Sequence, residues 1–166
     1  MNTHPAQLPT EELANDCQFR RQRRSGPGGQ HRNKVETGVF IEHAPTGIAA
    51  AATEKRSQEV NRRRALFRLR IRLAVNHRTP VPYPRSLLWQ ERCRHGRISV
   101  NSEHDDFPAI LAEVLDVLAW NRFEMATAAE QLSCTSSQLV KLLRAEPTAL
   151  AYVNAIRIEN GARPLK

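Results

Sequence analysis

The sequence is poor in the residues that mark disulfide-rich and membrane proteins. It holds 3 cysteines, odd in number and far apart, so a disulfide framework is not expected and a reducing compartment is the default. No unbroken apolar run is longer than five residues, far short of the roughly 20 that a helix needs to cross a bilayer. The first twenty residues have no apolar stretch typical of a secretory signal. We therefore expect a soluble, cytoplasmic protein without a membrane partner.

The sequence also gives little support for a metal site or for a surface on which nucleic-acid bases stack. Cys93, His95 and His104 match no spacing typical of a zinc site, so we expect no metal, and no pattern indicates a cofactor. Aromatic residues make up only 5% of the chain, fewer than a stacking platform for single-stranded nucleic acid needs. We expect a monomer.

Charge is present in excess and is unevenly distributed. Residues 1 to 102 hold 19 Lys and Arg against 8 Asp and Glu, a formal charge of +11, whereas residues 103 to 166 hold 6 against 9, a charge of −3. A basic segment with few aromatic rings favours binding to a polyanion through its phosphates.

The first half of the chain predicts a small sheet followed by a helix. Residues 1 to 15 are polar and contain two prolines, so we expect a flexible N-terminus. Residues 16 to 24 are expected to be extended. Residues 37 to 43 and 48 to 53 predict a hairpin, with Pro and Gly between them in turn positions. A helix is expected to begin at Ser57.

That helix carries an apolar face and an arginine face. Val60, Ala65, Leu66, Leu69 and Leu73 fall largely on one side at helical spacing. The other side holds six arginines within eleven residues: Arg62, Arg63, Arg64, Arg68, Arg70 and Arg72. A solvated surface helix is the ordinary interpretation, and contact with nucleic acid is the one that we favour.

The second half predicts helices. Three prolines between residues 79 and 86 exclude a helix there, and we expect a linker or transition over residues 79 to 104. Residues 105 to 166 predict a helical domain that resembles a helix-turn-helix, with Ser136, Ser137, Gln138 and Lys141 on its second helix. Because this segment is acidic, we favour a helical bundle or a module that binds a macromolecular partner over DNA binding. The expected fold class is α+β, a small domain over residues 16 to 78, with a β-hairpin or sheet and a packed helix, followed by an all-α segment.

The string SGPGGQHRNK, residues 25 to 34, is the feature that composition leaves unexplained. Its spacing fits neither a phosphate-binding P-loop nor a dinucleotide fingerprint, and it lacks the frame of a nucleophile elbow. From composition alone, a surface loop without chemistry is as plausible as a functional one.

The order of the residues resembles the class I peptide chain release factors, which hydrolyse peptidyl-tRNA on the ribosome. Residues 24 to 34 fit the family pattern R-S-G-x-G-G-Q-H-x-N-K. Residues 45 to 48 resemble its hairpin P-T-G-I, and residues 56 to 66 resemble its helix start R-S-Q-x-x-N-x-x-x-A-L. The three motifs occur in the family's order and cover about a third of the chain.

The resemblance implies a catalytic loop formed by Gly28, Gly29 and Gln30. The glycines let the backbone approach the ester without a Cβ in the way, and the backbone N–H of Gln30 would stabilise the developing charge. The Gln30 side chain would admit water rather than a larger nucleophile. His31 is a weak candidate for a general base, because most of the machinery would be ribosomal RNA.

The remaining residues of the motif are assigned by the same resemblance. Loop-shaping residues are Ser25, Gly26, Pro27, His31 and Asn33. Residues expected to bind RNA phosphates are Arg20, Arg21, Arg23, Arg24, Arg32, Lys34, Arg62, Arg63 and Arg64. The expected partners are the ribosome, through its large-subunit RNA, and peptidyl-tRNA. A glutamine methyltransferase acting on Gln30 is a further candidate partner, because the family's glutamine is often methylated.

The chain also departs from the family. Only about 24 residues precede the loop, too few for a domain that reads stop codons, so the chain resembles codon-independent members that rescue stalled ribosomes. Residues 105 to 166 are acidic overall and predict helices, whereas those members usually carry a basic tail, so we expect this segment to be a helical bundle or a ribosome- or protein-binding module. Arg32 stands where a small apolar residue is common. A non-catalytic ribosome- or RNA-binding protein and a DNA-associated helix-turn-helix protein are the alternative functions.

Overall fold

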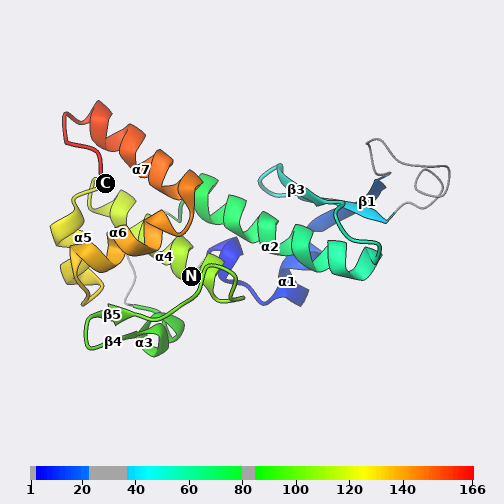
Figure 1. The fold of residues 1–166 in the computed structure, drawn as a ribbon, viewed down its shortest axis with the longest axis horizontal. Helices are drawn as coiled ribbons and strands as arrows, with labels where there is room; N and C mark the ends of the chain where they lie inside the picture. Colours follow the sequence, from blue (N-terminus) through cyan, green and yellow to red (C-terminus); the bar gives the residue numbers. More distant parts are fainter. Residues whose placement is uncertain (1–2, 23–36, 80–84) are drawn as a thin grey trace.

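The computed structural model describes residues 3–22, 37–79 and 85–166. A three-stranded antiparallel sheet lies at one end of a long helix, α2 (Gln58–Asn76), and the C-terminal helices gather at its other end (Figure 1). The predicted α+β class, with helices gathered in the C-terminal part, is confirmed.

The sheet consists of β1 (Cys17–Gln22), β2 (Gly38–His43) and β3 (Ile48–Ala52) in the order β1-β2-β3. The predicted hairpin is β2–β3, and its turn closes through a bond of 2.9 Å from the N–H of Gly47 to the carbonyl of His43. Gly47 has a φ of +67°, a left-handed conformation that glycine adopts without steric cost. The local turn residues therefore predicted this part of the sheet correctly.

Helix α2 begins where the sequence predicts. The Ser57 side chain accepts a hydrogen bond from the N–H of Val60 and caps the helix. Leu69 and Leu73 are fully buried against the sheet and the helical part. Val60, predicted on the apolar face, is 39% exposed, because at helical spacing it points away from the face that carries the buried Asn61, Ala65 and Leu69.

The N-terminal segment is folded, so the expected flexibility is wrong for residues 3 to 15. A 3-10 helix (Pro5–Gln7) and α1 (Thr10–Asn15) precede β1, and His4, Ala6 and Leu13 are buried. The His4 ring accepts from the N–H of Ala6 and contacts the carbonyl of His77 at 3.1 Å. Its pKa is lowered to about 4, mainly because burial disfavours the charged ring.

The stretch expected as a linker over residues 79 to 104 is largely folded from residue 85 onward. It forms α3 (Leu87–Arg92) and a hairpin of β4 (Cys93–Arg94) and β5 (Arg97–Ile98). Trp89 is buried, and its indole N–H donates to the carbonyl of Leu132 at 2.9 Å. The sequence pattern did not show that Trp89 ties this short helix to the C-terminal part.

Two buried carboxylates of α4 (Phe107–Trp120) hold the ends of the proline segment. Asp116 accepts from the N–H of Thr79 at 3.1 Å and pairs with Arg78 at 3.2 Å. Three residues earlier on α4, Glu113 accepts from the N–H of Ser86 at 2.8 Å and from its hydroxyl at 2.5 Å. Both segments that flank residues 80 to 84 are therefore fixed to one helix.

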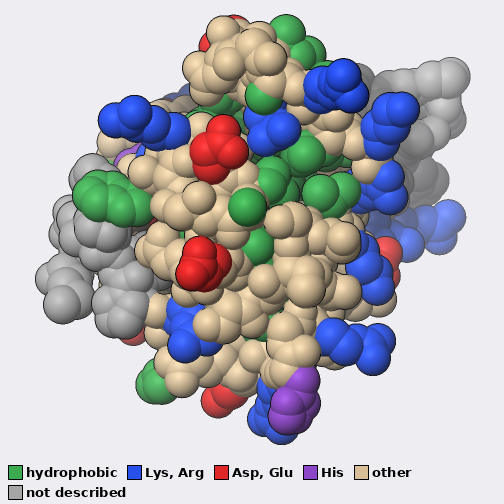
Figure 2. Space-filling view, turned by 90° about the vertical axis from the view of Figure 1, so that its left-hand side faces the viewer, with side chains coloured by type: hydrophobic (Ala, Val, Ile, Leu, Met, Phe, Trp, Pro, Cys, Tyr) green, Lys and Arg blue, Asp and Glu red, His purple; other side chains and the backbone are tan. Residues whose placement is uncertain are grey.

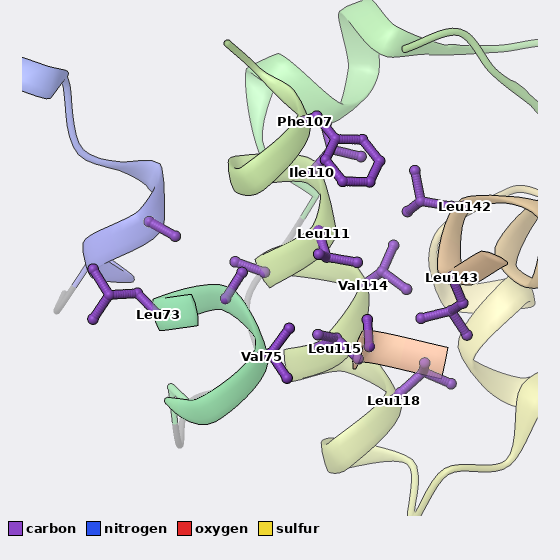
Figure 3. Close-up of a cluster of buried hydrophobic side chains, with 14 of the residues drawn as sticks. Leu73, Val75, Phe107, Ile110, Leu111, Val114, Leu115, Leu118, Leu142 and Leu143 are labelled. Carbon is purple, nitrogen blue, oxygen red and sulfur yellow. The ribbon is translucent and has the colours of Figure 1, made fainter. Parts of the chain in front are cut away.

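The helices of residues 105 to 166 share their core with α2. Helix α4 lies between α2 and α6 (Ser136–Arg144), and Figure 3 shows Leu73 and Val75 on one side of it and Leu142 and Leu143 on the other. Helices α5 (Met125–Gln131) and α7 (Pro147–Glu159) complete the bundle. Residues 105 to 166 are thus helical as predicted, but their core is continuous with that of the first half.

Candidate functional site

The residues predicted to carry chemistry lie outside the described residues, in the segment 23–36. These are Gly28, Gly29 and Gln30, the loop-shaping Ser25, Gly26, Pro27, His31 and Asn33, and the basic Arg23, Arg24, Arg32 and Lys34. Their roles stay predictions. The structure describes how the segments on either side of them are held.

Strands β1 and β2 carry the two ends of the segment. They pair antiparallel, with Gln22 opposite Gly38 and Arg21 opposite Val39. The chain therefore leaves β1 and returns to β2 at directly adjacent positions, because opposite residues of an antiparallel pair lie about 5 Å apart.

Asn61 is the residue that holds the return point. Its side chain is fully buried, and its Nδ2 donates to the carbonyls of Thr37 at 2.7 Å and Lys55 at 2.9 Å. Its Oδ1 accepts from the N–H of Lys55 at 3.0 Å. One amide thus joins α2 to the residue before β2 and to the segment after β3. The sequence motif contains Asn61, but nothing in the pattern indicated this role.

The two predicted RNA-binding arginines of β1 lie on opposite faces of the sheet. Arg21 is opposite the buried Val39, on the face that α2 covers, and Arg20 is opposite Phe40 on the other face. Both side chains are exposed. A single flat RNA surface would not contact both, so the sheet offers cations along its edge rather than on one face.

The first turns of α2 present exposed arginines, as predicted. The Arg62 guanidinium lies 4.8 Å from the centroid of the Phe19 ring on β1, a cation–π contact. Arg63 pairs with Glu59 at 3.1 Å on the exposed surface, which partly neutralises it. No ion pair or hydrogen bond of the Arg64 side chain is described within residues 3–22, 37–79 and 85–166.

The later arginines of α2 have structural partners, so the arginine face is not one continuous binding surface. Arg70 is buried and donates to the carbonyls of Ala6 and Asp105. Arg68 donates to the carbonyl of Ala51 at 2.8 Å and pairs with Glu54. Arg72 donates to the carbonyl of Ala49 at 2.5 Å.

Arg68 and Arg72 protect an open sheet edge. Among the described residues, strand β3 pairs with β2 alone, and alternate carbonyls of an edge strand point away from the sheet. The carbonyls of Ala49 and Ala51 are two residues apart, and each accepts a hydrogen bond from an α2 arginine. These side chains thus close the edge to pairing with another strand.

Nucleophilic side-chain chemistry has little support among the described residues. Burial raises the pKa of the Cys17 thiol to about 11 and that of Cys134 to about 12, and it also raises the pKa of Cys93. Thiolates are therefore scarce at neutral pH. Within the described ranges, no cluster of metal-ligating side chains occurs, and no helix is long and apolar enough to span a bilayer.

The segment 23–36 lies within the part of the chain that matches a known protein family. The RF-1 domain family matches residues 9–95, which include β1, β2, β3 and α2. The chloroplastic peptide chain release factor PrfB1 of Arabidopsis thaliana is 51% identical over 69 residues, which are 42% of this chain and 14% of that protein.

Two bacterial relatives show the same limited coverage. Peptide chain release factor 2 of Paramagnetospirillum magneticum is 52% identical over 58 residues, 35% of this chain and 16% of its own length. Peptide chain release factor 1 of Acidiphilium cryptum is 57% identical over 51 residues, 31% of this chain and 14% of its own length. The matched part thus spans less than a fifth of these relatives, while the family domain spans more than half of this chain. The chain belongs to the class I peptide chain release factor family, through its RF-1 domain.

Proposed function

We propose that this protein hydrolyses the ester of peptidyl-tRNA on the ribosome. The observation that carries the proposal is the string at residues 24 to 34, which fits the family's pattern in a chain that contains the RF-1 domain. The paired ends of β1 and β2, and Asn61 beside the second of them, would hold this segment at a defined place.

In the proposed mechanism, the backbone rather than an ionisable side chain acts on the ester. Gly28 and Gly29 let the chain come close to the reacting carbonyl carbon, and the Gln30 N–H donates to the oxygen on which charge develops. One such donor is worth roughly 3 kcal/mol in the transition state. The Gln30 side chain selects water as the nucleophile, and ribosomal RNA supplies the remaining groups.

The finer part of the proposal is that release does not depend on a stop codon. The protein would then act on stalled ribosomes, with large-subunit RNA and peptidyl-tRNA as partners. Arg20, Arg62 and Arg64 support the RNA contact, because they are exposed cations on β1 and in the first two turns of α2. A glutamine methyltransferase acting on Gln30 belongs to the same proposal, as do a monomeric state and a place in the cytoplasm.

The test uses purified ribosomes that hold labelled peptidyl-tRNA. The mRNAs either end in the P site or continue with a stop or a sense codon. Gly29→Ala places a Cβ where the backbone approaches the ester, and we expect release to fall about a hundredfold, the equivalent of one oxyanion donor. Gln30→Ala keeps the backbone N–H and should lose less. Gln18→Ala, an exposed glutamine on β1, is the matched control and should leave release unchanged.

Each outcome separates the candidate functions. Release from mRNAs without a stop codon, lost in Gly29→Ala, supports codon-independent hydrolysis, whereas release only at stop codons refutes that finer part. Ribosome binding without release from any complex contradicts the hydrolase and supports a non-catalytic binding protein.

A DNA-binding role for the helix-turn-helix has less support. Gln138 was predicted on the second helix of this unit, but its Oε1 accepts a hydrogen bond from the N–H of Ile98 at 3.1 Å. Helix α6 packs against β5 at that point. The hairpin therefore occupies part of the surface that a DNA groove would need.

A further inference from the structure

An open cavity lined by cations lies where α3, the β4–β5 hairpin and α6 meet. It measures about 530 Å³, and its basic side chains are Arg92, Arg97, His104 and Lys141. None of the described residues that line it is acidic, although residues 103 to 166 carry a formal charge of −3. Figure 2 shows Lys and Arg side chains near the lower edge of the molecule, the level at which the hairpin lies in Figure 1.

Local structure fixes these side chains around the cavity. The turn between β4 and β5 has positive φ at His95 (+50°) and Gly96 (+74°), the pattern of a tight two-residue hairpin. The hairpin brings Arg97 opposite Arg94. The bond from the N–H of Ile98 to Gln138 Oε1 fixes α6 against the hairpin, which places Lys141, one turn later, at the rim.

Arg92 and His104 bring two nitrogen atoms together at the wall of the cavity. Nη2 of Arg92, which always carries protons, lies 3.2 Å from Nε2 of His104. The other ring nitrogen, Nδ1, lies 3.1 Å from the backbone N of Asp106 and 3.5 Å from its Oδ2. When Nδ1 accepts from that N–H, the proton of the neutral ring is on Nε2, and both nitrogens then offer a donor to an acceptor in the cavity.

Asp106 pairs with one side of the Arg92 guanidinium. Its Oδ2 accepts from Nε of Arg92 at 2.8 Å and from Nη2 at 2.5 Å. Each guanidinium NH₂ carries two protons, so Nη2 keeps one donor for the cavity. Within the described residues, no ion pair is found for Arg97 or Lys141, and their charges are available to a ligand.

We propose that this cavity binds a phosphate group of an RNA strand. One phosphate oxygen would accept from both Nε2 of His104 and Nη2 of Arg92, and the others would face Arg97 and Lys141. Donors arriving from three elements suit a tetrahedral anion better than a flat carboxylate, which offers two oxygens in one plane. The choice of RNA as the source of the phosphate rests on the proposed function, but phosphate binding does not depend on hydrolysis.

The neighbouring surface fits the rest of a nucleotide. A second cavity of about 80 Å³ shares Ile98, Val100 and Lys141 with the first and adds Leu142 and Ala145. A ribose or base attached to the phosphate can lie against these apolar atoms. The site is separate from residues 23 to 36 in sequence, so it would give the C-terminal half its own contact with RNA.

The first experiment titrates the full-length ¹⁵N-labelled protein with inorganic phosphate and follows its amide resonances. We expect saturable shifts at Ser99 and Asn101 and in the His104 ring. Sodium chloride at equal ionic strength should produce none of them, and acetate should produce them only weakly. Equal shifts with acetate would overturn the proposal in favour of a carboxylate site, the chemistry of an acidic peptide. Shifts no larger than those with chloride would overturn it altogether.

Variants then tie binding to the cavity. R97Q/K141Q should weaken phosphate binding at least about tenfold, because hydrogen bonds to charged groups are worth about 1.5–3 kcal/mol. R163Q/K166Q removes the same charge at the C-terminus, on the other side of the helical part (Figure 1), and should bind phosphate like the wild type. Equal weakening in both variants would show a nonspecific effect of net charge and would refute the site.

A short oligouridylate tests RNA as the source. In R97Q/K141Q, the slope of log affinity against log salt should fall by about 0.7 for each cation removed from single-strand contact. An unchanged slope would contradict RNA as the ligand, even if free phosphate binds. Gln30→Ala should keep both phosphate and RNA binding, so failure of the hydrolase proposal and failure of this one give different results.

Discussion

Replacing Asn61 by alanine tests whether one buried amide holds the base of the segment that carries Gln30. The change removes three hydrogen bonds, two donated to the carbonyls of Thr37 and Lys55 and one accepted from the N–H of Lys55. At about 1 kcal/mol net for each bond, the free energy of unfolding should fall by about 3 kcal/mol. Asn61→Asp should cost at least as much, because its carboxylate would face two carbonyl oxygens.

The measurement is urea unfolding, with Asn76→Ala as the matched control. Asn76 is an exposed asparagine on the same helix whose Nδ2 donates only to the carbonyl of Arg72, one turn before it. Its loss should change stability by no more than about 0.5 kcal/mol. If Asn61→Ala and Asn76→Ala lose the same small amount, the amide does not hold these segments together.

Peptide release gives the functional half of this test. Under conditions where Asn61→Ala is fully folded, its release rate on the ribosome should still fall, because Thr37 directly follows the segment with the GGQ residues. The Asn76 variant should release at the wild-type rate. A folded Asn61→Ala protein with wild-type release would refute a positioning role and leave Asn61 a stability residue only.

Four further variants test the packing and the charges of the described residues. Arg72→Ala should lower the free energy of unfolding in urea by about 1–2 kcal/mol and promote association, since it frees the carbonyl of Ala49 on an edge strand. Arg64→Ala should instead weaken RNA binding and leave stability unchanged. Leu115→Ala should cost about 2–5 kcal/mol, because the side chain is fully buried; a smaller loss would contradict the shared core. Burial raises the pKa of Glu113 above its usual 4.5, so its contribution to stability is present below that pH and is lost as pH rises through the folded pKa. Wild-type stability should therefore fall relative to Glu113→Gln over that window, and parallel pH profiles would contradict the assignment.

Sequence reasoning succeeded where the signals were local. Pro45 and Gly47 marked the turn of β2–β3, and Ser57 marked the start of α2. Each of these signals acts within a few residues through backbone geometry or capping. The order of residues 24 to 34 likewise indicated the family, because that motif is contained in one short stretch of the chain.

It failed where a side chain's partner lies far along the chain. His4 and Arg70 are polar residues in polar surroundings of the sequence, yet both are buried, because His77 and Ala6 meet them across more than 60 residues. The expected N-terminal flexibility was wrong for this reason. Trp89 showed the same limit, since its partner, the carbonyl of Leu132, belongs to a helix end that the local pattern could not place.

The division of the α2 arginines shows why composition overestimates a binding surface. Arg62 and Arg64 lie within the first two turns and face solvent, whereas Arg68 and Arg72 lie beside β3 and donate to its free carbonyls. Charge is the same in both groups, but only the first keeps its donors for a ligand. The salt dependence of RNA binding by α2 should therefore reflect only the arginines of its first turns. A larger salt dependence would point to cations outside α2, such as those of β1, of residues 23 to 36 and of the cavity around Arg97.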